Sequence, residues 1–275
     1  MYSSDVGKSS DEGSDNRLNT SLHHNKSLVF MKKIIPFTIL LFFLFITVTF
    51  AQTCPEDATA LNPAPLEEEW AIEWWMPRHE AKLTEEGRES ADVLFLGDSI
   101  THGWETTGKA VTEDYFSGYS IYNIGFGGDR TENVLWRFNH GEIDGISPEL
   151  AVLMIGTNNT GHRQDSPECT AKGIETILQE LGEKLPDTEI LLLAIFPRGE
   201  TPDNELRQLN NEINQRIESF ADGETIHFMN INSTFLDENG HLPEEIMPDH
   251  LHPNEQGYEL WAEAMLPVIR ELLSQ

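Results

Sequence analysis

From Asp92 onward, short apolar runs alternate with longer segments whose apolar residues recur with the period of an α-helix. The runs are almost continuously apolar, as are strands that are covered on both faces of a sheet. Strands are predicted at Val93–Leu96, Ser120–Ile124, Ala151–Ile155, Ile190–Phe196 and Ile226–Ile231. Because strands that alternate with helices form parallel sheets, the sequence predicts an α/β fold, a three-layer α/β/α sandwich with a central parallel sheet.

Three of the intervening segments have the periodicity of amphipathic helices. They are Thr170–Leu185, Glu205–Phe220 and Glu255–Leu273. A kink is predicted at Pro267 in the last of them. Pro167 after Ser166 suits a helix start, and Asp129 with Glu132 three residues later resembles a capping pair. The helices supply the outer layers of the predicted sandwich.

The N-terminal 51 residues have the order of a secretory signal peptide. Lys32 and Lys33 precede an apolar run from Ile34 to Phe50, and Ala51 offers a small-residue cleavage site. We expect translation to begin at Met31, or else residues 1–30 to form a disordered extension. An uncleaved membrane anchor is the alternative, because the run is long enough to span a bilayer. The sequence therefore predicts export to the periplasm or the extracellular space, with no stable membrane insertion after cleavage.

The rest of the chain divides into a lead-in, residues 52–90, and one α/β domain, residues 91–275. The lead-in contains an acidic, tryptophan-rich stretch that is predicted as a helix. Trp70, Trp74 and Trp75 have helix-compatible spacing within it. Such an aromatic stripe is far more often packed against a domain than used to bind a ligand. A structural role is therefore predicted for all three tryptophans.

The chain carries 18 Lys and Arg against 47 Asp and Glu, a formal net charge of −29. Such a surface repels phosphate backbones and anionic membranes, so nucleic acid is excluded as a partner. The two cysteines, Cys54 and Cys169, leave two states open. They could form a disulfide in an oxidising compartment or stay as two thiols.

Four polar motifs lie where predicted strands end or where the last helix begins. They are Gly97-Asp98-Ser99, Gly125-Phe126-Gly127-Gly128-Asp129, Gly156-Thr157-Asn158-Asn159 and Asp249-His250-Leu251-His252. Loops that leave the carboxyl ends of parallel strands meet at one edge of the sheet. We therefore expect the four loops to form one site.

Ser99 is the candidate nucleophile of this site, because it opens the turn directly after a buried strand. A serine hydroxyl is nearly inert at neutral pH and needs a base. Asp249 precedes His252 by three residues, so its carboxylate can bond one imidazole nitrogen while the other takes the proton of Ser99. His252 is predicted as the base and Asp249 as its orienting carboxylate. His250 and His102 are the competing bases.

Three groups can donate to an oxyanion at this edge. Gly127 and Gly128 let backbone N–H groups approach closely, because no side chain blocks the way. The N–H of Ser99 and the side-chain amide of Asn158 add further donors. Ser99, Gly128 and Asn158 are therefore predicted to form an oxyanion hole, and Asn159 is predicted to help or to stabilise its loop.

A metal site is the alternative use of the same residues. His250 and His252, with Asp249 or Asp98, could ligate zinc, but the chain lacks the longer-range Cys/His pairing or the helical His-x-x-x-His that zinc sites use. The glycine run does not match the dinucleotide-binding Gly-x-Gly-x-x-Gly, and no complete phosphate loop, Gly-x-x-x-x-Gly-Lys-Ser/Thr, occurs. We therefore expect chemistry without a metal or a cofactor.

The four motifs resemble those of the GDSL, or SGNH, hydrolase family, whose fold is a flavodoxin-like three-layer α/β/α domain. The family's blocks contain a Ser in Gly-Asp-Ser, a Gly, an Asn in Gly-x-Asn and a C-terminal Asp-x-x-His. The matching residues are Ser99, Gly128, Asn158, Asp249 and His252. The resemblance extends from about Val93 to the end, implies an SGNH hydrolase domain over residues 91–275, and gives these residues the family's catalytic and oxyanion roles. Asn159 departs from the pattern, since many members have Asp there.

Within the family, the sequence is most similar to the catalytic-subunit-like esterases of platelet-activating factor acetylhydrolase IB. The similar segments are Asn123–Asp129, Val134–Arg137, Gly141–Glu142, Val152–Asn159 and Phe196–Gly199. Those relatives are cytosolic and dimeric and remove acetyl groups. The resemblance therefore implies a homodimer, whereas the predicted export signal sets this chain apart from them.

Together these features predict a secreted serine esterase that hydrolyses short acyl, chiefly acetyl, esters through an acyl-enzyme. A carbohydrate O-deacetylase acting on a small-molecule or carbohydrate ester is the favoured form. One alternative is a short-chain lipid esterase like platelet-activating factor acetylhydrolase. A second, of another class, is a non-catalytic carbohydrate-binding protein on a hydrolase scaffold, against which the complete set of site residues argues.

Overall fold

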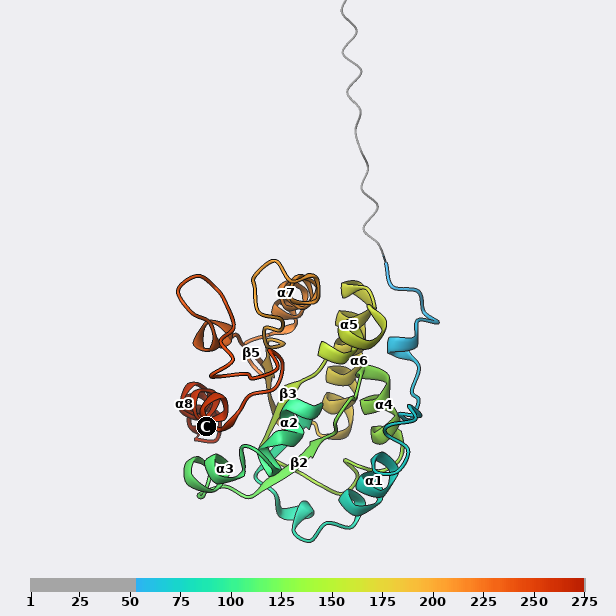
Figure 1. Ribbon diagram of the computed structural model, residues 1–275. Helices are drawn as coiled ribbons and strands as arrows, with labels where there is room; N and C mark the ends of the chain where they lie inside the picture. The colour runs from blue at the N-terminus through green and yellow to red at the C-terminus, as the bar shows by residue number, and fades with distance from the viewer. Residues whose placement is uncertain (1–52, 275) are drawn as a thin grey trace, which may run out of the picture. The chain divides into compact units, whose positions relative to one another are not determined.

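The computed structural model describes residues 53–274, which Figure 1 shows as a sheet with helices packed on both sides. The predicted signal peptide and residues 1–30 lie outside the described residues. Across 53–274, no helix is long and apolar enough to cross a membrane.

Five parallel strands form the central sheet. They are β1 Val93–Gly97, β2 Ile121–Gly125, β3 Leu150–Met154, β4 Glu189–Leu193 and β5 Ile226–Met229. Their order is β2-β1-β3-β4-β5, so the predicted α/β fold is confirmed. The chain passes from β1 to β2 on one side and then returns to place β3 on the other. This switch point sets the loops after β1 and β3 side by side at the carboxyl edge of the sheet.

Two strands end earlier than predicted, at Leu193 instead of Phe196 and at Met229 instead of Ile231. From Ile195 on, asparagine side chains replace the neighbouring strand as hydrogen-bond partners of the backbone. Asn214 accepts from the N–H of Ile195 at 2.8 Å and donates to its carbonyl at 2.9 Å. An apolar run alone cannot reveal this change of hydrogen-bond partner, because the residues stay buried whether a strand or a side chain bonds their backbone.

Eight α-helices flank the sheet within the described part of the chain. They are α1 Trp75–Leu83, α2 Ser99–His102, α3 Lys109–Tyr115, α4 Thr131–Asn139, α5 Thr157–Arg163, α6 Pro167–Lys184, α7 Glu205–Ile217 and α8 Glu255–Leu272. On one face, Leu94 and Leu96 of β1 pack in a cluster with α1, α4, α6 and α7. On the other face, Val93 and Phe95 pack with α3 and α8. Figure 1 shows these two helices on the side of the sheet opposite to α4 and α6. The alternation along β1 thus builds two cores, one on each face.

Two local predictions at the N-terminal side of the domain are wrong. The helix predicted in the tryptophan-rich stretch begins only at Trp75, because residues 70–74 form a turn. Asp129 and Glu132 are not a capping pair. The cap of α4 is Arg130, whose N–H donates to the side chain of Asn133 at 2.9 Å. Pro167 and Ser166 do begin α6 as predicted, with the Ser166 hydroxyl accepting from the N–H of Cys169.

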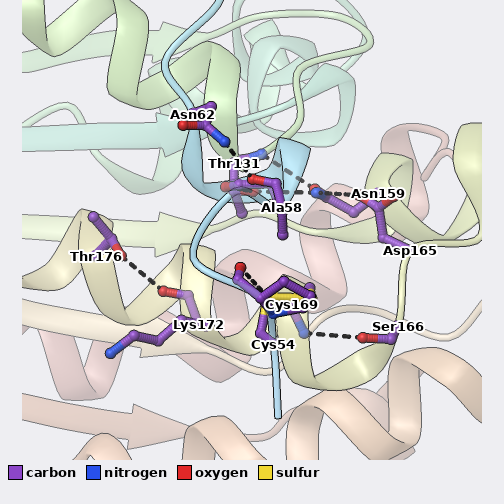
Figure 2. Close-up of a disulfide and its surroundings, with 12 residues drawn as sticks. Cys54, Ala58, Asn62, Thr131, Asn159, Asp165, Ser166, Cys169, Lys172 and Thr176 are labelled. Carbon is purple, nitrogen blue, oxygen red and sulfur yellow. Dashed lines mark hydrogen bonds between the residues drawn. A yellow bond between two sulfur atoms is a disulfide. The ribbon is translucent and has the colours of Figure 1, made fainter. Parts of the chain in front are cut away.

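The lead-in is tied to the domain by a disulfide between Cys54 and Cys169, which Figure 2 shows at the start of α6. The segment then runs across α4, where Thr131 donates its hydroxyl to the carbonyl of Ala60 and Asn133 donates to that of Ala64. The sequence left open whether Cys54 and Cys169 form a disulfide or stay as thiols, and the structure contains the disulfide. The disulfide and these bonds fix the course of the chain toward Trp70.

Candidate active site

Ser99 lies at the first position of α2, directly after β1. The carboxylate of Asp98 accepts from the N–H of Ile100 at 3.0 Å and caps the helix. A side chain at Gly97 would collide with Thr101 and the backbone of β3, so the tight packing there requires glycine. These features aim the half-buried Ser99 side chain at the carboxyl edge of the sheet.

The predicted triad residues meet at this edge. Ser99 Oγ lies 2.9 Å from His252 Nε2, although 153 positions separate the two residues. His252 Nδ1 lies 2.6 Å from Asp249 Oδ2, and the other carboxylate oxygen accepts from the N–H groups of Leu251 and His252. The Asp249 carboxylate thus holds a tautomer whose Nε2 is free to accept the serine proton.

Hydrogen bonding keeps Asp249 ionised for this task. Burial raises the pKa of the Asp249 carboxyl, but the hydrogen bonds and charge of His252 outweigh burial and hold the pKa below its ordinary value. The carboxylate is therefore charged throughout the neutral range, so it would stabilise an imidazolium if His252 took a proton.

The two competing histidines bond elsewhere. His250 adopts a left-handed φ of 52° and its Nδ1 lies 2.9 Å from the carbonyl of Leu242. His102 packs beside Trp74, and its pKa is lowered to about 4, first by burial and then by the charge of Arg78. Of the three candidate bases, His252 is the one that Ser99 contacts.

Two of the three predicted oxyanion donors, Gly128 and Asn158, lie on the loops after β2 and β3. Gly128 adopts φ +78°, a left-handed conformation that favours glycine, and a Cβ built on Gly127 would lie 3.9 Å from Ser99 Cβ. Asn158 donates one side-chain N–H to the carbonyl of Asp129 at 3.0 Å, which fixes it beside the glycine turn. An amide carries two such hydrogens, so the second is available to a ligand. Asn159 instead bonds Thr131 and Asp165, the loop-stabilising role expected for it.

A buried charged cluster that the sequence did not predict lies behind this turn. Asp129 accepts from Trp75 Nε1 at 2.6 Å and from Arg137 Nε and Nη2 at 2.9 and 2.8 Å. Arg137 also pairs with Glu142, whose carboxylate lies 3.3 Å from His79 Nδ1. Burial raises the pKa of Asp129 to about 6, while Arg137 and Trp75 oppose the rise and favour the ionised form. The cluster anchors the residue that follows Gly128.

The three tryptophans do not share the single structural role predicted for them. Trp75 is fully buried, as expected. Trp70 is 53% exposed, and a Cβ on Gly128 would collide with its ring. The ring of Trp74 lies 3.2 Å from the place of a Cβ on Gly127. Trp70 and Trp74 therefore border the candidate oxyanion turn.

No group of three or more His, Cys, Asp or Glu side chains within the described residues is placed to hold a metal ion. His252 and Asp249 bond each other, and His250 faces Leu242, so the alternative zinc set does not converge.

Replacing Asp98 by asparagine should flatten the pH dependence of stability. Burial raises the pKa of Asp98 from 3.8 to about 7 in the folded protein. The folded state therefore favours the protonated carboxyl, and this contribution is complete below about pH 4 and lost as the pH rises through about 7. Between about pH 5 and pH 8 the loss amounts to about 3 kcal/mol. Asparagine still accepts from Ile100 and does not ionise.

Urea denaturation of wild type and Asp98→Asn at these two pH values measures the effect. The matched control is Asp187→Asn, which changes an exposed aspartate. An equal pH dependence in wild type and Asp98→Asn would contradict the prediction.

Comparisons with known proteins place the chain in a family of ester hydrolases. A family model described as the GDSL-like lipase/acylhydrolase family matches residues 95–260. The human platelet-activating factor acetylhydrolase IB subunit alpha1 is 31% identical over 224 residues, which cover 80% of this chain and 93% of that protein.

Solved structures share the fold. A GDSL-like lipase from Bacteroides thetaiotaomicron aligns with a TM-score of 0.60 at 23% identity, covering 71% of this chain and 97% of that one. A variant of an acetyl-xylooligosaccharide esterase from a Geobacillus species aligns with a TM-score of 0.53 at 18% identity, covering 67% and 94%. At these identities the likeness is one of architecture.

Proposed function

Because the chain belongs to the GDSL-like lipase/acylhydrolase family and is thus an ester hydrolase, we propose that it is a serine esterase that removes acetyl groups from carbohydrates. The observation that carries the proposal is the continuous hydrogen-bonded chain from Ser99 through His252 to Asp249. A nucleophile, a base and an orienting carboxylate in this order are what acyl transfer to serine requires.

In the proposed reaction, Ser99 Oγ attacks the ester carbonyl while His252 Nε2 takes the hydroxyl proton. The negative charge on the carbonyl oxygen is stabilised by the N–H groups of Ser99 and Gly128 and by the free amide hydrogen of Asn158. His252 then protonates the departing alcohol and leaves an acyl-enzyme. A water molecule, deprotonated by His252, attacks this ester, and the acid departs as Ser99 regains its proton.

Two observations favour a carbohydrate ester as the substrate. The side chains of His252 and Asp249 are 43% and 56% exposed, so the base is open to a bulky alcohol. A structural neighbour is named as an acetyl-xylooligosaccharide esterase. A short-chain lipid ester is the second candidate, favoured by the likeness to platelet-activating factor acetylhydrolase IB subunits.

Export is part of the same proposal. Its support is the apolar run behind Lys32 and Lys33 and the Cys54–Cys169 disulfide, since disulfides persist in oxidising compartments. A mature chain outside the cytoplasm would meet acetylated polysaccharides directly. The proposed catalytic unit is residues 91–275, with residues 52–90 as a lead-in.

Acetate release from acetylated xylan and a chain-length series of p-nitrophenyl esters test the substrate. We expect acetate release and a steep fall in kcat/KM from acetyl to octanoyl esters. Hydrolysis of a short-chain phospholipid ester with no acetate from xylan would instead favour the lipid candidate. Inactivity toward every ester would reject the enzymatic proposal and leave the carbohydrate-binding alternative.

A further inference from the structure

Trp70 and Trp74 form an aromatic surface beside the candidate oxyanion turn, which we name the indole platform. Their ring centroids lie 6.3 Å apart with an interplanar angle of 30°. Trp70 is 53% exposed, unlike the buried Trp75 five residues later. An exposed aromatic ring next to reactive groups is a candidate binding surface.

The platform adjoins the site on its oxyanion side. The ring of Trp70 lies against Gly128, and the ring of Trp74 lies against Gly127, where the position of a Cβ is also 3.9 Å from Ser99 Cβ. A substrate whose carbonyl oxygen bonds Gly128 therefore brings its adjoining atoms within reach of the indoles. Since Trp70 opens to solvent, it suits the part of the substrate that extends outward, the alcohol, and not a small acyl group.

The platform is held in place before any ligand arrives. Trp74 Nε1 donates to the carbonyl of Trp70 at 3.1 Å, and Ala71 between them is buried. Glu68 accepts from the guanidinium of Arg130 at 3.2 Å, and its carbonyl accepts from the N–H of Ala71. A preorganised surface spends little conformational entropy on binding.

Two imidazoles pack beside the platform and are uncharged at neutral pH. His162 packs edge-on against Trp70, and His102 packs against Trp74. The pKa of His162 is lowered, first by burial and then by the charge of Arg130, and the pKa of His102 is lowered to about 4. Neutral imidazoles can donate to and accept from hydroxyl groups at neutral pH.

We propose that the indole platform is a stacking subsite for a pyranose ring in the alcohol part of the substrate. A pyranose has an apolar C–H face that packs on an indole and a rim of hydroxyl groups that suits the neighbouring imidazoles. The subsite deepens the proposed carbohydrate esterase function and rests on it. A lipid surface is the less suitable partner, because the chain's net charge of −29 repels anionic membranes.

The first test compares kcat/KM for acetylated xylotetraose with kcat/KM for ethyl acetate, a small ester without a ring. In Trp70→Ala the ratio of the two should fall by about tenfold, the effect of losing one aromatic contact. Trp70→Phe should keep most of the ratio. Ile72→Ala is the matched control, because Ile72 is 60% exposed in the same turn and is not part of the platform.

A second measurement does not depend on turnover. Calorimetric binding of acetylated xylotetraose to Ser99→Ala should weaken by about tenfold when Trp70→Ala is added. No oligosaccharide binding, or an unchanged ratio and affinity in Trp70→Ala, would overturn the subsite. The protein could instead bind phosphatidylcholine vesicles, with Trp70→Ala and Ile72→Ala weakening this binding equally. That result would overturn the pyranose subsite in favour of lipid docking. If the wild type hydrolyses carbohydrate esters and Trp70→Ala hydrolyses them equally well, the platform is rejected and the proposed function stands.

Discussion

Replacing Ser99 by alanine should reduce the kcat for p-nitrophenyl acetate by on the order of 10⁴- to 10⁶-fold. The hydroxyl that lies 2.9 Å from His252 Nε2 is the atom that would carry the acyl group, and alanine removes it with little change in volume. The helix α2 keeps its cap, because Asp98 and not Ser99 accepts from Ile100. The loss should therefore appear in kcat with the thermal unfolding midpoint nearly unchanged.

The control for this change is Ser219→Ala, which removes an exposed hydroxyl from the short helix after α7. A fluorophosphonate probe supplies a second readout, because it reacts with activated serines and not with ordinary ones. Mass spectrometry should find the label on Ser99 of the wild type and of Ser219→Ala. Full activity of Ser99→Ala, or labelling at another serine, would contradict the assignment of the nucleophile.

The positions of the proposed triad could be predicted because each residue lies in a short motif at the end of a strand or the start of a helix. In a parallel sheet these positions share one edge whatever the details of packing. The geometry agrees, since Ser99 and His252 come within hydrogen-bonding distance across 153 positions. Topology, together with the three-residue spacing of Asp249 and His252, was sufficient to predict that these side chains meet.

The different roles of the tryptophans could not be predicted, because they depend on where a helix begins. A helix through all three would have placed Trp70, Trp74 and Trp75 in one stripe. The turn over residues 70–74 instead separates them, so that Trp75 enters the core while Trp70 faces the site. The spacing of the tryptophans does not predict this turn. The contacts of the lead-in with α4 stabilise it.

The buried cluster around Arg137 was missed for a related reason. Asp129 suited a helix cap by sequence, and only the packed structure shows that it bonds Trp75 and Arg137. Arg137 within the apolar run Val134–Phe138 is the signal that could have found it, because a buried arginine requires carboxylates. The choice of partner is a tertiary property.

Replacing Arg137 by methionine should destabilise the protein by about 3–5 kcal/mol at pH 7.5. The guanidinium is fully buried between Asp129 and Glu142, which are also fully buried. Methionine fills much of the same volume but leaves two carboxylates without their counter-charge in a medium that disfavours ions. This loss of stability should shrink toward pH 5, where Asp129 becomes protonated and no longer needs a counter-charge. Burial already raises the pKa of Asp129 to about 6, and removal of Arg137 raises it further.

Urea denaturation of Arg137→Met at both pH values checks this, with Arg216→Met as the matched control. Arg216 pairs with Glu168 near the surface, so its loss should cost about 0–1 kcal/mol at either pH.

Arg137→Met also tests whether the cluster positions the oxyanion turn, because Asp129 follows Gly128 and its carbonyl accepts from Asn158. A shifted turn would lower kcat more than it raises KM, since Gly128 and Asn158 are proposed to bond the transition state more strongly than the substrate. A deficit below about 1 kcal/mol at pH 7.5, equal to that of the surface pair, would show that the buried cluster does not stabilise the fold as argued.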